Sequence, residues 1–368
     1  MTSSFAEIPT LNLSWADDSA RRPQLLAQLR HALVDVGFLY ISHHGVPGVV
    51  VANLVNELPN LFALPDAEKE RIALHNSAQF LGYSAADTEI TAGQPDRREQ
   101  VEFATEHHDS WTPDQPVYDR LRGPNQWPDA ASAPGLRPAV EAYLDALTAL
   151  GERFLELVAE ALFLPTHALL SFLSDQHRLK LVHYPKVDVK DDTTGENRQG
   201  VGPHKDSSGW WTFLLQASPP PIGGLQALNR AGEWIDVPAV PGTFVVNIGQ
   251  AFEVVTHGVC PATTHRVLAG ADERFSVPFF QGVRRNLTKT EALGALQGHF
   301  QKHFPERFLE STDASSSVES AEGRQIDSPF LRGRYETWGE SQLRTKVRSH
   351  RDVGARFYGN VFNQYTHD

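Results

Sequence analysis

The sequence predicts an α+β protein in which helices wrap around an antiparallel β-core, either a sandwich or a barrel. Two observations support this fold class. Apolar residues recur at helical spacing in the first half of the chain and near its end, whereas the stretch between them breaks into short β-rich segments. We therefore expect a helix-rich region at 1–178, a β-core at 179–285 and C-terminal helices at 286–368, packed as one compact unit.

The N-terminal half is expected to be largely helical. Leucines and valines at helical spacing predict a helix over Pro23–Val36, and Gly37 is a typical helix stop. A longer pattern of the same kind predicts one amphipathic helix from Pro138 to about Leu164. Two short apolar runs, Leu11–Leu13 and Phe38–Ile41, predict strands.

The central part of the chain changes to strand patterns near Leu179. Short runs of β-branched, aromatic and other apolar residues, bounded by turn residues, predict six strands: Leu179–Tyr184, Trp211–Gln216, Gly224–Leu228, Trp234–Val237, Gly242–Ile248 and Phe275–Gln281. The residues Asn229–Gly232 between two of them predict a hairpin connection. Several short strands at this spacing favour an antiparallel sandwich or barrel.

The C-terminal part returns to helix. We expect one helix from Thr290 to about Phe304 and a helical tail from Ser341 to Tyr358. Between them, Ser311–Ser328 is rich in serine and acidic residues and poor in apolar ones, which predicts a loop or linker.

Composition and charge limit the class of protein. A chain of 368 residues with 40% hydrophobic residues can build a core large enough to enclose a site. The net charge of −12 argues against broad attraction to nucleic acid or to an anionic membrane. The single cysteine excludes an intrachain disulfide, and neither a signal-peptide pattern nor a membrane-length apolar run is present. We expect a cytoplasmic protein without a nucleic-acid or membrane partner.

One group of side chains predicts a metal site. His204 and Asp206 are two residues apart, and residues i and i+2 of an extended chain point to the same face. His265 follows after several expected strands and can supply a third ligand. Two histidines and one carboxylate on one side of an ion leave the opposite positions open, which is typical of non-haem Fe(II) oxygenases. Zinc takes the same ligand types, so these three residues alone leave the metal open.

Two neighbouring side chains are alternatives to His265. His257 precedes a glycine in a turn-like stretch and is the rival third ligand. Cys260 is also close in sequence to His265, but a small packed thiol is the simpler interpretation.

Arg274 and Ser276 form a second pattern on an expected strand. The R-x-S spacing presents both side chains to one face, where a guanidinium and a hydroxyl make a good receptor for a carboxylate. An arginine inside a β-core is costly to bury without an anion. A dicarboxylate that chelates the metal at one end and reaches Arg274 at the other meets both needs.

Taken together, these motifs resemble the isopenicillin N synthase-like branch of the Fe(II)/2-oxoglutarate-dependent oxygenases. The resemblance covers nearly the whole chain, in the order IPTLNL, LRHALVDVGFLYISHHGVP, HYPKV, GPHKDSSGWWTFLLQ, IGGLQAL, GEWIDVPAVPGTFVVNIG, THRV and ERFSVPFF. The segment EITAGQPDRREQ is also similar to the bacterial ethylene-forming enzymes and to a set of fungal oxygenases within this branch. The branch places a non-ligand at the position of His257.

The resemblance implies a double-stranded β-helix (jelly-roll) as the catalytic core, with Fe(II) as the metal and O₂ and 2-oxoglutarate as co-substrates. It implies that Arg274, Ser276 and Tyr184 hold the distal carboxylate of 2-oxoglutarate, and it makes ascorbate a candidate reductant. The expected function is hydroxylation or desaturation of a small organic molecule, in secondary metabolism.

Two other functions stay open at the level of sequence. One is an Fe(II) oxidase of the isopenicillin N synthase or ethylene-forming type, because isopenicillin N synthase uses the same R-x-S residues for the carboxylate of its substrate. The other, from a different class, is a non-catalytic ligand-binding protein on the same scaffold. The sequence does not determine the substrate, the type of product or the oligomeric state.

Five further residues are candidates for substrate contacts. Trp210, Trp211 and Phe280 flank the motif strands and can line a pocket, although aromatic residues on strands usually belong to the core. Arg97 and Arg98 lie in the segment similar to the ethylene-forming enzymes, where a cation can meet an acidic substrate. A solvated charged loop is an equally good interpretation of these two arginines.

Overall fold

Two facing β-sheets form the centre of the computed structural model, which describes residues 4–187, 199–308, 326 and 328–367. The larger sheet contains, in spatial order, β1 (Thr10–Asn12), β2 (Phe38–Ser42), β12 (Thr243–Ile248), β9 (Trp211–Gln216), β14 (Arg274–Phe280), β7 (Arg178–Tyr184), β6 (Glu99–Ala104) and β3 (Gly82–Ser84). The smaller sheet contains β11 (Trp234–Asp236), β10 (Leu225–Leu228), β13 (His265–Leu268) and β8 (Gln199–His204). The strands β4 (Ile90–Thr91) and β5 (Gln94–Pro95) form a separate short hairpin that does not pair with a strand of either sheet.

Strand pairing in both sheets is antiparallel, apart from the parallel pair β1–β2. Apolar side chains from both sheets meet between them, for example Val182 and Val245 from the larger sheet and Val201 and Leu225 from the smaller. This is the jelly-roll core that the resemblance predicts.

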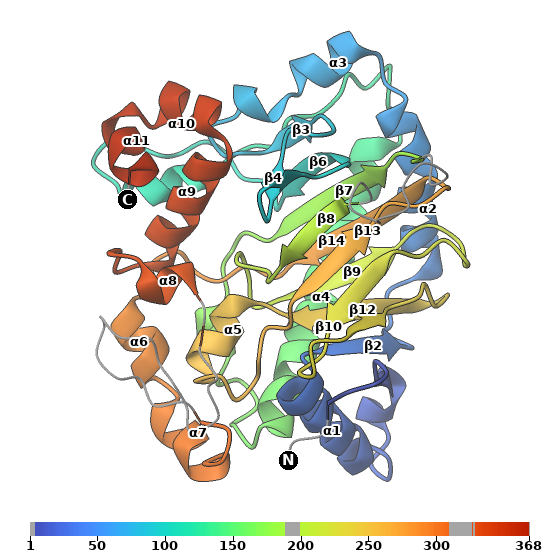
Figure 1. Cartoon of the computed structure of the whole chain (residues 1–368), viewed down its shortest axis with the longest axis vertical. Coiled ribbons are helices and arrows are strands. Elements are labelled where there is room, and N and C mark those ends of the chain that lie inside the picture. Colours follow the sequence, from blue (N-terminus) through green and yellow to red (C-terminus); the bar gives the residue numbers. More distant parts are fainter. Residues whose placement is uncertain (1–3, 188–198, 309–325, 327, 368) are drawn as a thin grey trace.

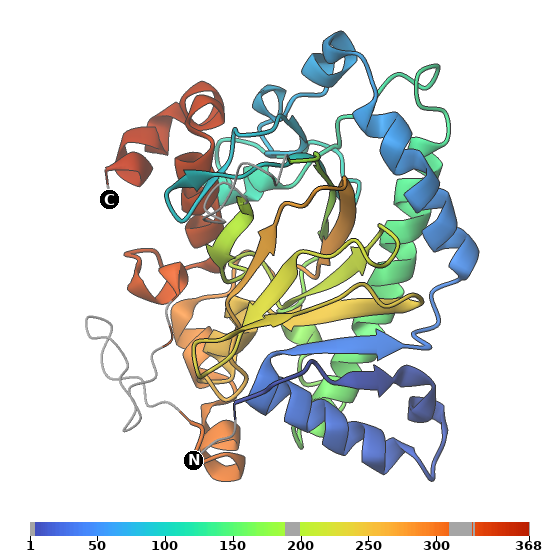
Figure 2. The ribbon, with the colours of Figure 1, turned by 45° about the vertical axis from the view of Figure 1, so that its right-hand side comes forward.

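Helices cover the face of the larger sheet that points away from the smaller sheet. The helical elements are η1 (Leu13–Asp17), α1 (Arg22–His31), η2 (Ala32–Val36), α2 (Gly48–Phe62), α3 (Asp66–Arg71), η3 (Leu74–Asn76), η4 (Val117–Leu121), α4 (Leu136–Ala161), η5 (Leu170–Phe172), α5 (Gln250–Val255), α6 (Lys289–Gly294), α7 (Gln297–His303), α8 (Pro329–Arg332), α9 (Trp338–Ser349), α10 (Arg351–Phe357) and α11 (Gly359–Thr366). Figure 2 shows α2 and α4 side by side against this sheet. None of the helices within the described residues is long and apolar enough to cross a membrane.

Strand alternation gives the larger sheet two chemically different faces. In β9, Trp211 and Phe213 point into the core beneath α4, whereas Thr212 and Leu214 point into the space between the sheets. In β14, Arg274 and Ser276 also face that space. The inner face of this sheet therefore combines apolar residues with a few polar ones.

The C-terminal helices α9, α10 and α11 lie beside the hairpin strand β4 and the edge strand β3 of the larger sheet (Figure 1). Helix α9 begins with a capping box, in which Thr337 and Glu340 satisfy each other's backbone N–H groups. Its apolar residues Leu343 and Val347 pack in a cluster with Phe80. The opposite side of α9 is left to face the space between the sheets.

The expected β-segments and their hairpin are confirmed. The six expected strands correspond to β7, β9, β10, β11, β12 and β14, with boundaries that differ by at most a residue at each end. The side chain of Asn229 accepts hydrogen bonds from the backbone N–H groups of Ala231 and Glu233, and Gly232 adopts a φ of +82°. These contacts close the hairpin between β10 and β11.

The expected first helix is confirmed, but it changes character along its length. It begins as α1, continues as the π-helical turn η2, and ends at Gly37, where φ is +75°. A Cβ at Gly37 would lie 2.3 Å from the hydroxyl oxygen of Thr263, so this turn requires glycine.

Two expected helices prove to be interrupted. The helix expected at Thr290–Phe304 is two helices, α6 and α7, because α6 ends at Gly294, a poor helix former. The helix expected at Ser341–Tyr358 is split into α9 and α10 at His350, whose backbone is not helical (φ −128°, ψ 75°). Most of the loop expected at Ser311–Ser328 lies outside the described residues.

The sequence did not predict several strands. β8 and β13 were missed because they contain few apolar residues and include glycine, proline or charged residues. β3 and β6 lie in the helix-rich region and, with β1 and β2, join the larger sheet. The region boundaries expected at residues 179 and 286 stay a prediction.

Candidate active site

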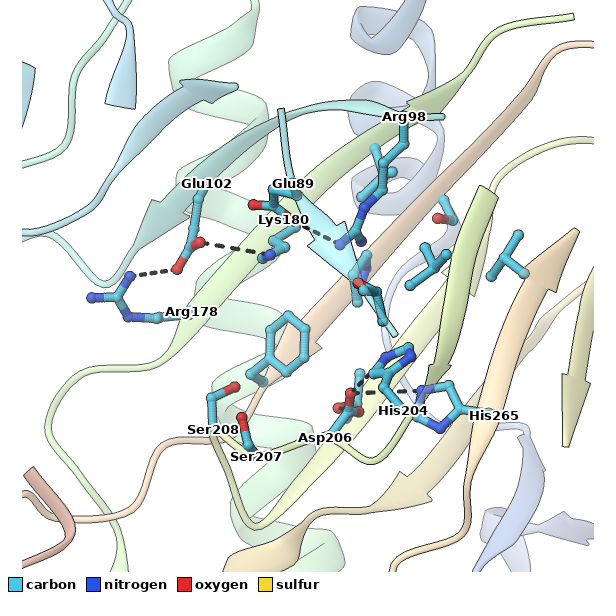
Figure 3. A pocket seen from close by; sticks show the side chains of 18 of the residues that line it. Glu89, Arg98, Glu102, Arg178, Lys180, His204, Asp206, Ser207, Ser208 and His265 are labelled. Atoms are coloured by element: carbon cyan, nitrogen blue, oxygen red, sulfur yellow. Dashed lines mark hydrogen bonds and ion pairs between the residues drawn. The ribbon is translucent and has the colours of Figure 1, made fainter. Parts of the chain in front are cut away.

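A cavity of about 460 Å³ lies between the two sheets and contains His204, Asp206 and His265 in its wall. Strands of both sheets, the loop after β8 and helix α9 all contribute side chains to it. Figure 3 shows the two histidines and the aspartate together at one side of this cavity, and a group of charged side chains at the other.

Strand pairing brings the three candidate ligands together. His204 ends β8, His265 begins β13, and the two are paired directly across the smaller sheet. Asp206 follows in the loop after β8, which is fixed by a hydrogen bond from the backbone N–H of Gln250 to the Asp206 carbonyl. The Nε2 atoms of His204 and His265 lie 3.5 and 3.6 Å from Asp206 Oδ1. All three ligand atoms lie within 4.8 Å of one another, close enough to hold a single ion.

Both histidines are held in the tautomer that a metal ligand needs. Nδ1 of His204 lies 2.9 Å from the carbonyl oxygen of Gly202, and Nδ1 of His265 lies 3.1 Å from that of Thr263. Because a carbonyl oxygen only accepts, each Nδ1 carries the proton and each Nε2 presents a lone pair to the cavity. Thr263 in turn donates its hydroxyl to the carbonyl of Val36 at 2.7 Å, which fixes the chain just before His265.

Asp206 is oriented by two donors from the larger sheet. The Thr212 hydroxyl and the Asn247 amide donate to its Oδ2 at 2.5 and 2.7 Å, which leaves Oδ1 directed at the histidines. Burial alone would raise the pKa of Asp206, but the two histidines and Thr212 hold it well below its usual range. Asp206 is therefore a carboxylate at neutral pH.

His265 is neutral at the same pH. Burial, and then the neighbouring His204, lower its pKa to about 4, despite the opposing effect of Asp206. Two imidazoles that present Nε2 and a fixed carboxylate that presents Oδ1 form a donor set suited to Fe(II). Because the three ligand atoms lie in the cavity wall, an ion bound to them would be accessible from the cavity.

A buried cation lies in the same cavity without a carboxylate partner among the described residues. Arg274 is 3% exposed, its Nη2 donates to Gln216 Oε1 at 3.2 Å, and its Nη1 has no hydrogen-bond partner in the described part of the chain. Burial lowers the pKa of Arg274. Its guanidinium carbon lies 4.9 Å from the centre of the Tyr184 ring.

The register of the larger sheet explains why the expected carboxylate receptor is assembled. Arg274 pairs with Tyr184 and Ser276 pairs with Val182 across β14 and β7, so the three polar side chains face the cavity together. An unsatisfied buried guanidinium N–H beside a hydroxyl fits one carboxylate of a dicarboxylate ligand.

The alternatives to His265 lie elsewhere. His257 is 1% exposed, its Nε2 donates to the carbonyl of Leu293 at 2.7 Å, and its ring stacks on Phe308. Cys260 is fully buried in the main core. Neither side chain lines the cavity, so His257 is not the third ligand in this arrangement.

The expectation that Trp210 and Trp211 line the pocket is wrong. Both indoles are buried in the core on the opposite face of the larger sheet, where each packs edge-on against Phe252. Trp211 and Thr212 are adjacent in β9, so their side chains point to opposite faces of the sheet. Thr212 faces the cavity, and Trp211 therefore faces the core. Phe280, in contrast, lines the cavity as expected.

The two candidate arginines separate. Arg97 lines a different depression with Asp87 and Lys186, outside the cavity that holds the histidines. Arg98 lines that cavity and pairs with Glu89 at 2.7 Å and with Asp96 at 3.2 Å. Its side chain is 14% exposed, so Arg98 is a partly buried, paired cation and not part of a solvated loop.

Sequence reasoning missed several residues of the cavity. Thr212, Asn247 and Gln216 support the groups described above, and Lys180 and Lys346 line the far wall. The signal for the first three was present, because each is a polar residue inside an otherwise apolar strand. No local pattern distinguishes the two lysines.

Comparisons with known proteins agree with this geometry. Residues 8–130 match the family "non-haem dioxygenase in morphine synthesis N-terminal", and residues 176–283 match the 2OG-Fe(II) oxygenase superfamily. The chain is 40% identical to the 2-oxoglutarate-dependent dioxygenase frbJ of Dothideomycetidae sp. (strain 11243), over 96% of this chain and 92% of the relative.

Two solved structures share the fold. A putative 2OG-Fe(II) oxygenase family protein from Caulobacter crescentus aligns over 94% of this chain and 99% of its own, with a TM-score of 0.68 and 24% identity. A full-length Neurospora crassa protein, solved in complex with α-ketoglutarate and 5-formyluracil, aligns over 80% of this chain and 90% of its own, with a TM-score of 0.67 and 21% identity.

The jelly roll, the histidine–aspartate–histidine group and the identity to a named relative define the class: the chain belongs to the 2OG-Fe(II) oxygenase superfamily. It is an Fe(II)- and 2-oxoglutarate-dependent dioxygenase, with Fe(II) as its metal and 2-oxoglutarate and O₂ as its co-substrates.

Proposed function

We propose that His204, Asp206 and His265 bind Fe(II) and that Arg274, Ser276 and Tyr184 bind the distal carboxylate of 2-oxoglutarate. One observation carries this assignment. The buried Nη1 of Arg274 has no partner among the described residues, and it faces the cavity that holds the three ligand atoms. A dicarboxylate that spans the two groups would satisfy the guanidinium at one end and could bind the metal at the other.

Iron and 2-oxoglutarate, when bound, supply the oxidative decarboxylation of 2-oxoglutarate to succinate and CO₂, coupled to oxidation of a C–H bond of the substrate. The protein contributes position and protonation state. The carbonyls of Gly202 and Thr263 accept from Nδ1 of His204 and His265 and so direct each Nε2 towards the cavity, and Thr212 and Asn247 orient the Asp206 carboxylate.

The substrate in this proposal is a small organic molecule that is hydroxylated or desaturated in the cytoplasm, as part of secondary metabolism. The size of the cavity supports a small substrate, since about 460 Å³ is shared with the co-substrate. The high identity to a fungal 2-oxoglutarate-dependent dioxygenase supports the reaction class. Ascorbate stays a candidate reductant.

Anaerobic addition of Fe(II) and 2-oxoglutarate tests the assignment. We expect a weak visible charge-transfer band, and Arg274→Leu should raise the Kd for 2-oxoglutarate by about 10- to 100-fold, because it removes charge-assisted hydrogen bonds. Arg266→Leu is the matched control, since Arg266 lies on β13 but stacks on Trp234 away from the cavity. Equal loss of affinity in the two variants would contradict the proposed receptor.

Product analysis separates the alternatives. Substrate turnover with stoichiometric succinate supports the dioxygenase, whereas turnover without succinate would indicate an oxidase of the isopenicillin N synthase type. Failure to bind Fe(II) at all would favour the non-catalytic binding protein.

A further inference from the structure

The cavity extends away from the metal ligands along one face of β7. Arg178, Lys180, Val182 and Tyr184 alternate onto this face and all line the cavity. Tyr184 lies at the Arg274 end, and Lys180 lies four residues, about 13 Å, further along the strand. Along β7 the cavity wall therefore begins at the proposed co-substrate receptor with Tyr184, continues with the apolar Val182, and ends with the charged side chains of Lys180 and Arg178.

The charged end contains more cations than anions. Glu102, directly opposite Lys180 on β6, pairs with Arg178, with Lys346 of α9 at 3.2 Å and with Lys180 at 3.8 Å. Three cations thus share one carboxylate, as Figure 3 shows for Arg178 and Lys180. Their combined charge exceeds that of Glu102 by two.

The second acid of this wall is already occupied. Glu89 accepts from Arg98 at 2.7 Å and from the Gln100 amide at 2.5 Å, and its Oε1 lies 3.7 Å from His350. Both carboxylates therefore have their oxygen atoms engaged by protein donors. A cationic substrate would have to displace these partners, whereas an anionic one would not.

The two lysines keep N–H donors for a ligand. An ammonium group has three donors. Within the described residues, Lys346 uses one in its hydrogen bond to Glu102, and Lys180 makes its 3.8 Å ion pair with Glu102 and an electrostatic interaction with Glu89, neither of which is a hydrogen bond. Burial, followed by the repulsion of Arg178, lowers the pKa of Lys346 to about 8, even though Glu102 opposes the shift.

We propose that the substrate carries an anionic oxygen group, a carboxylate or a phosphate, that docks between Lys180 and Lys346. This inference rests on the proposed function, because it assigns the end of the cavity remote from the co-substrate receptor to the substrate. The bound anion would satisfy the unused ammonium donors, and the rest of the molecule would extend towards the metal ligands. A positive wall in a protein of net charge −12 would also select anions locally.

Calorimetric titration with matched pairs of probes tests this proposal. The probes are hexanoate against hexanamide, phenylacetate against phenylacetamide and phenyl phosphate against phenol, with hexylamine as a cation. Each is titrated anaerobically into the full chain with saturating 2-oxoglutarate, both with and without Fe(II). The carboxylates and the phosphate ester distinguish the two possible sources of the anionic group.

We expect at least one anion to bind about tenfold or more tightly than its neutral partner, and Lys180→Met/Lys346→Met to abolish this preference. Lys346→Arg should retain it because the charge is kept. The control Lys302→Met removes a charge from the exposed surface of α7 and should also retain it. Single Lys346→Met replaces the double variant if that protein does not fold, since Arg178 and Lys180 still pair with Glu102.

Three results would overturn the proposal: no anion preferred over its neutral partner, a preference that survives in the double lysine variant, or tighter binding of hexylamine than of hexanamide. The charge-transfer band reports separately on the proposed function. If the band fails to form but the lysine-dependent preference is present, the anion site stands and the co-substrate assignment falls.

Discussion

Thr212→Val removes one hydroxyl from the support of the proposed metal centre and leaves the shape of the side chain almost unchanged. The hydroxyl donates to Oδ2 of the buried Asp206 at 2.5 Å, and the Asn247 amide is the other donor to that oxygen. Without the hydroxyl, the carboxylate loses one of the two contacts that direct Oδ1 towards the histidines. We expect weaker metal binding with the three ligands still present.

The size of the effect follows from the charge on the acceptor. A hydrogen bond to an ionised group contributes about 1.5–3 kcal/mol, and loss of such a partner of a metal ligand costs about 10- to 100-fold in metal affinity. In the metal-free protein no metal stabilises the carboxylate, so the hydroxyl also contributes to the stability of that state. Part of the lost hydrogen-bond energy therefore lowers the stability of the metal-free protein, and only the rest weakens metal binding. We therefore expect the lower part of that range for the affinity, about 10- to 30-fold.

Anaerobic competition titration of Fe(II) against a chelator measures this change directly. Thr256→Val is the matched control, because its buried hydroxyl donates to the Phe252 carbonyl in α5 and does not line the cavity. An affinity within twofold of the unmutated protein in Thr212→Val, or an equal decrease in both variants, would refute the role given to the hydroxyl. Urea unfolding of the metal-free proteins shows how much of each effect is general stability.

Three other predictions follow from the geometry. His265→Ala should abolish the charge-transfer band with Fe(II) and 2-oxoglutarate, whereas His257→Ala should keep it; loss of the band in only the second variant would reverse the ligand assignment. Trp211→Ala should lower the free energy of unfolding by about 3–5 kcal/mol in urea titrations but leave the band, since its indole lies in the core. Burial alone would raise the pKa of Glu99, but hydrogen bonds, first among them that from His183, hold it at about 2, against 4.5 when free. Its stabilisation is therefore present above pH 4.5 and is lost as pH falls towards 2, so Glu99→Gln should be less stable than the unmutated protein at pH 7, and urea midpoints should converge below pH 4.5.

The sequence determined the features that depend on short spacing. The H-x-D and R-x-S pairs have a spacing of two residues, which in extended chain directs both side chains to the same face. Short apolar and β-branched runs bounded by turn residues likewise predicted the six central strands, and Gly37 marked the end of the first helix. The proposed roles of His204, Asp206 and Arg274 could be reached from these patterns because each depends on neighbours in the chain.

The missed strands show where such patterns fail. β8 and β13 have too few apolar residues to predict a strand, yet they carry His204 and His265 and pair with each other in the smaller sheet. Their backbone hydrogen bonds come from strand pairing, and Val201 and Val267 pack in the core between the sheets; together these contacts stabilise strands that their own residues do not favour.

Only the tertiary structure decided which distant side chains meet. It placed the Trp211 indole in the core because Thr212 takes the cavity face, and it engaged His257 with a backbone carbonyl far from the metal ligands. It also brought Lys346 of the C-terminal helix α9 against Glu102 of the N-terminal strand β6. The charge of the proposed substrate end thus arises from packing between elements at opposite ends of the chain, because a local pattern sets the face of a side chain but not its partner across the fold.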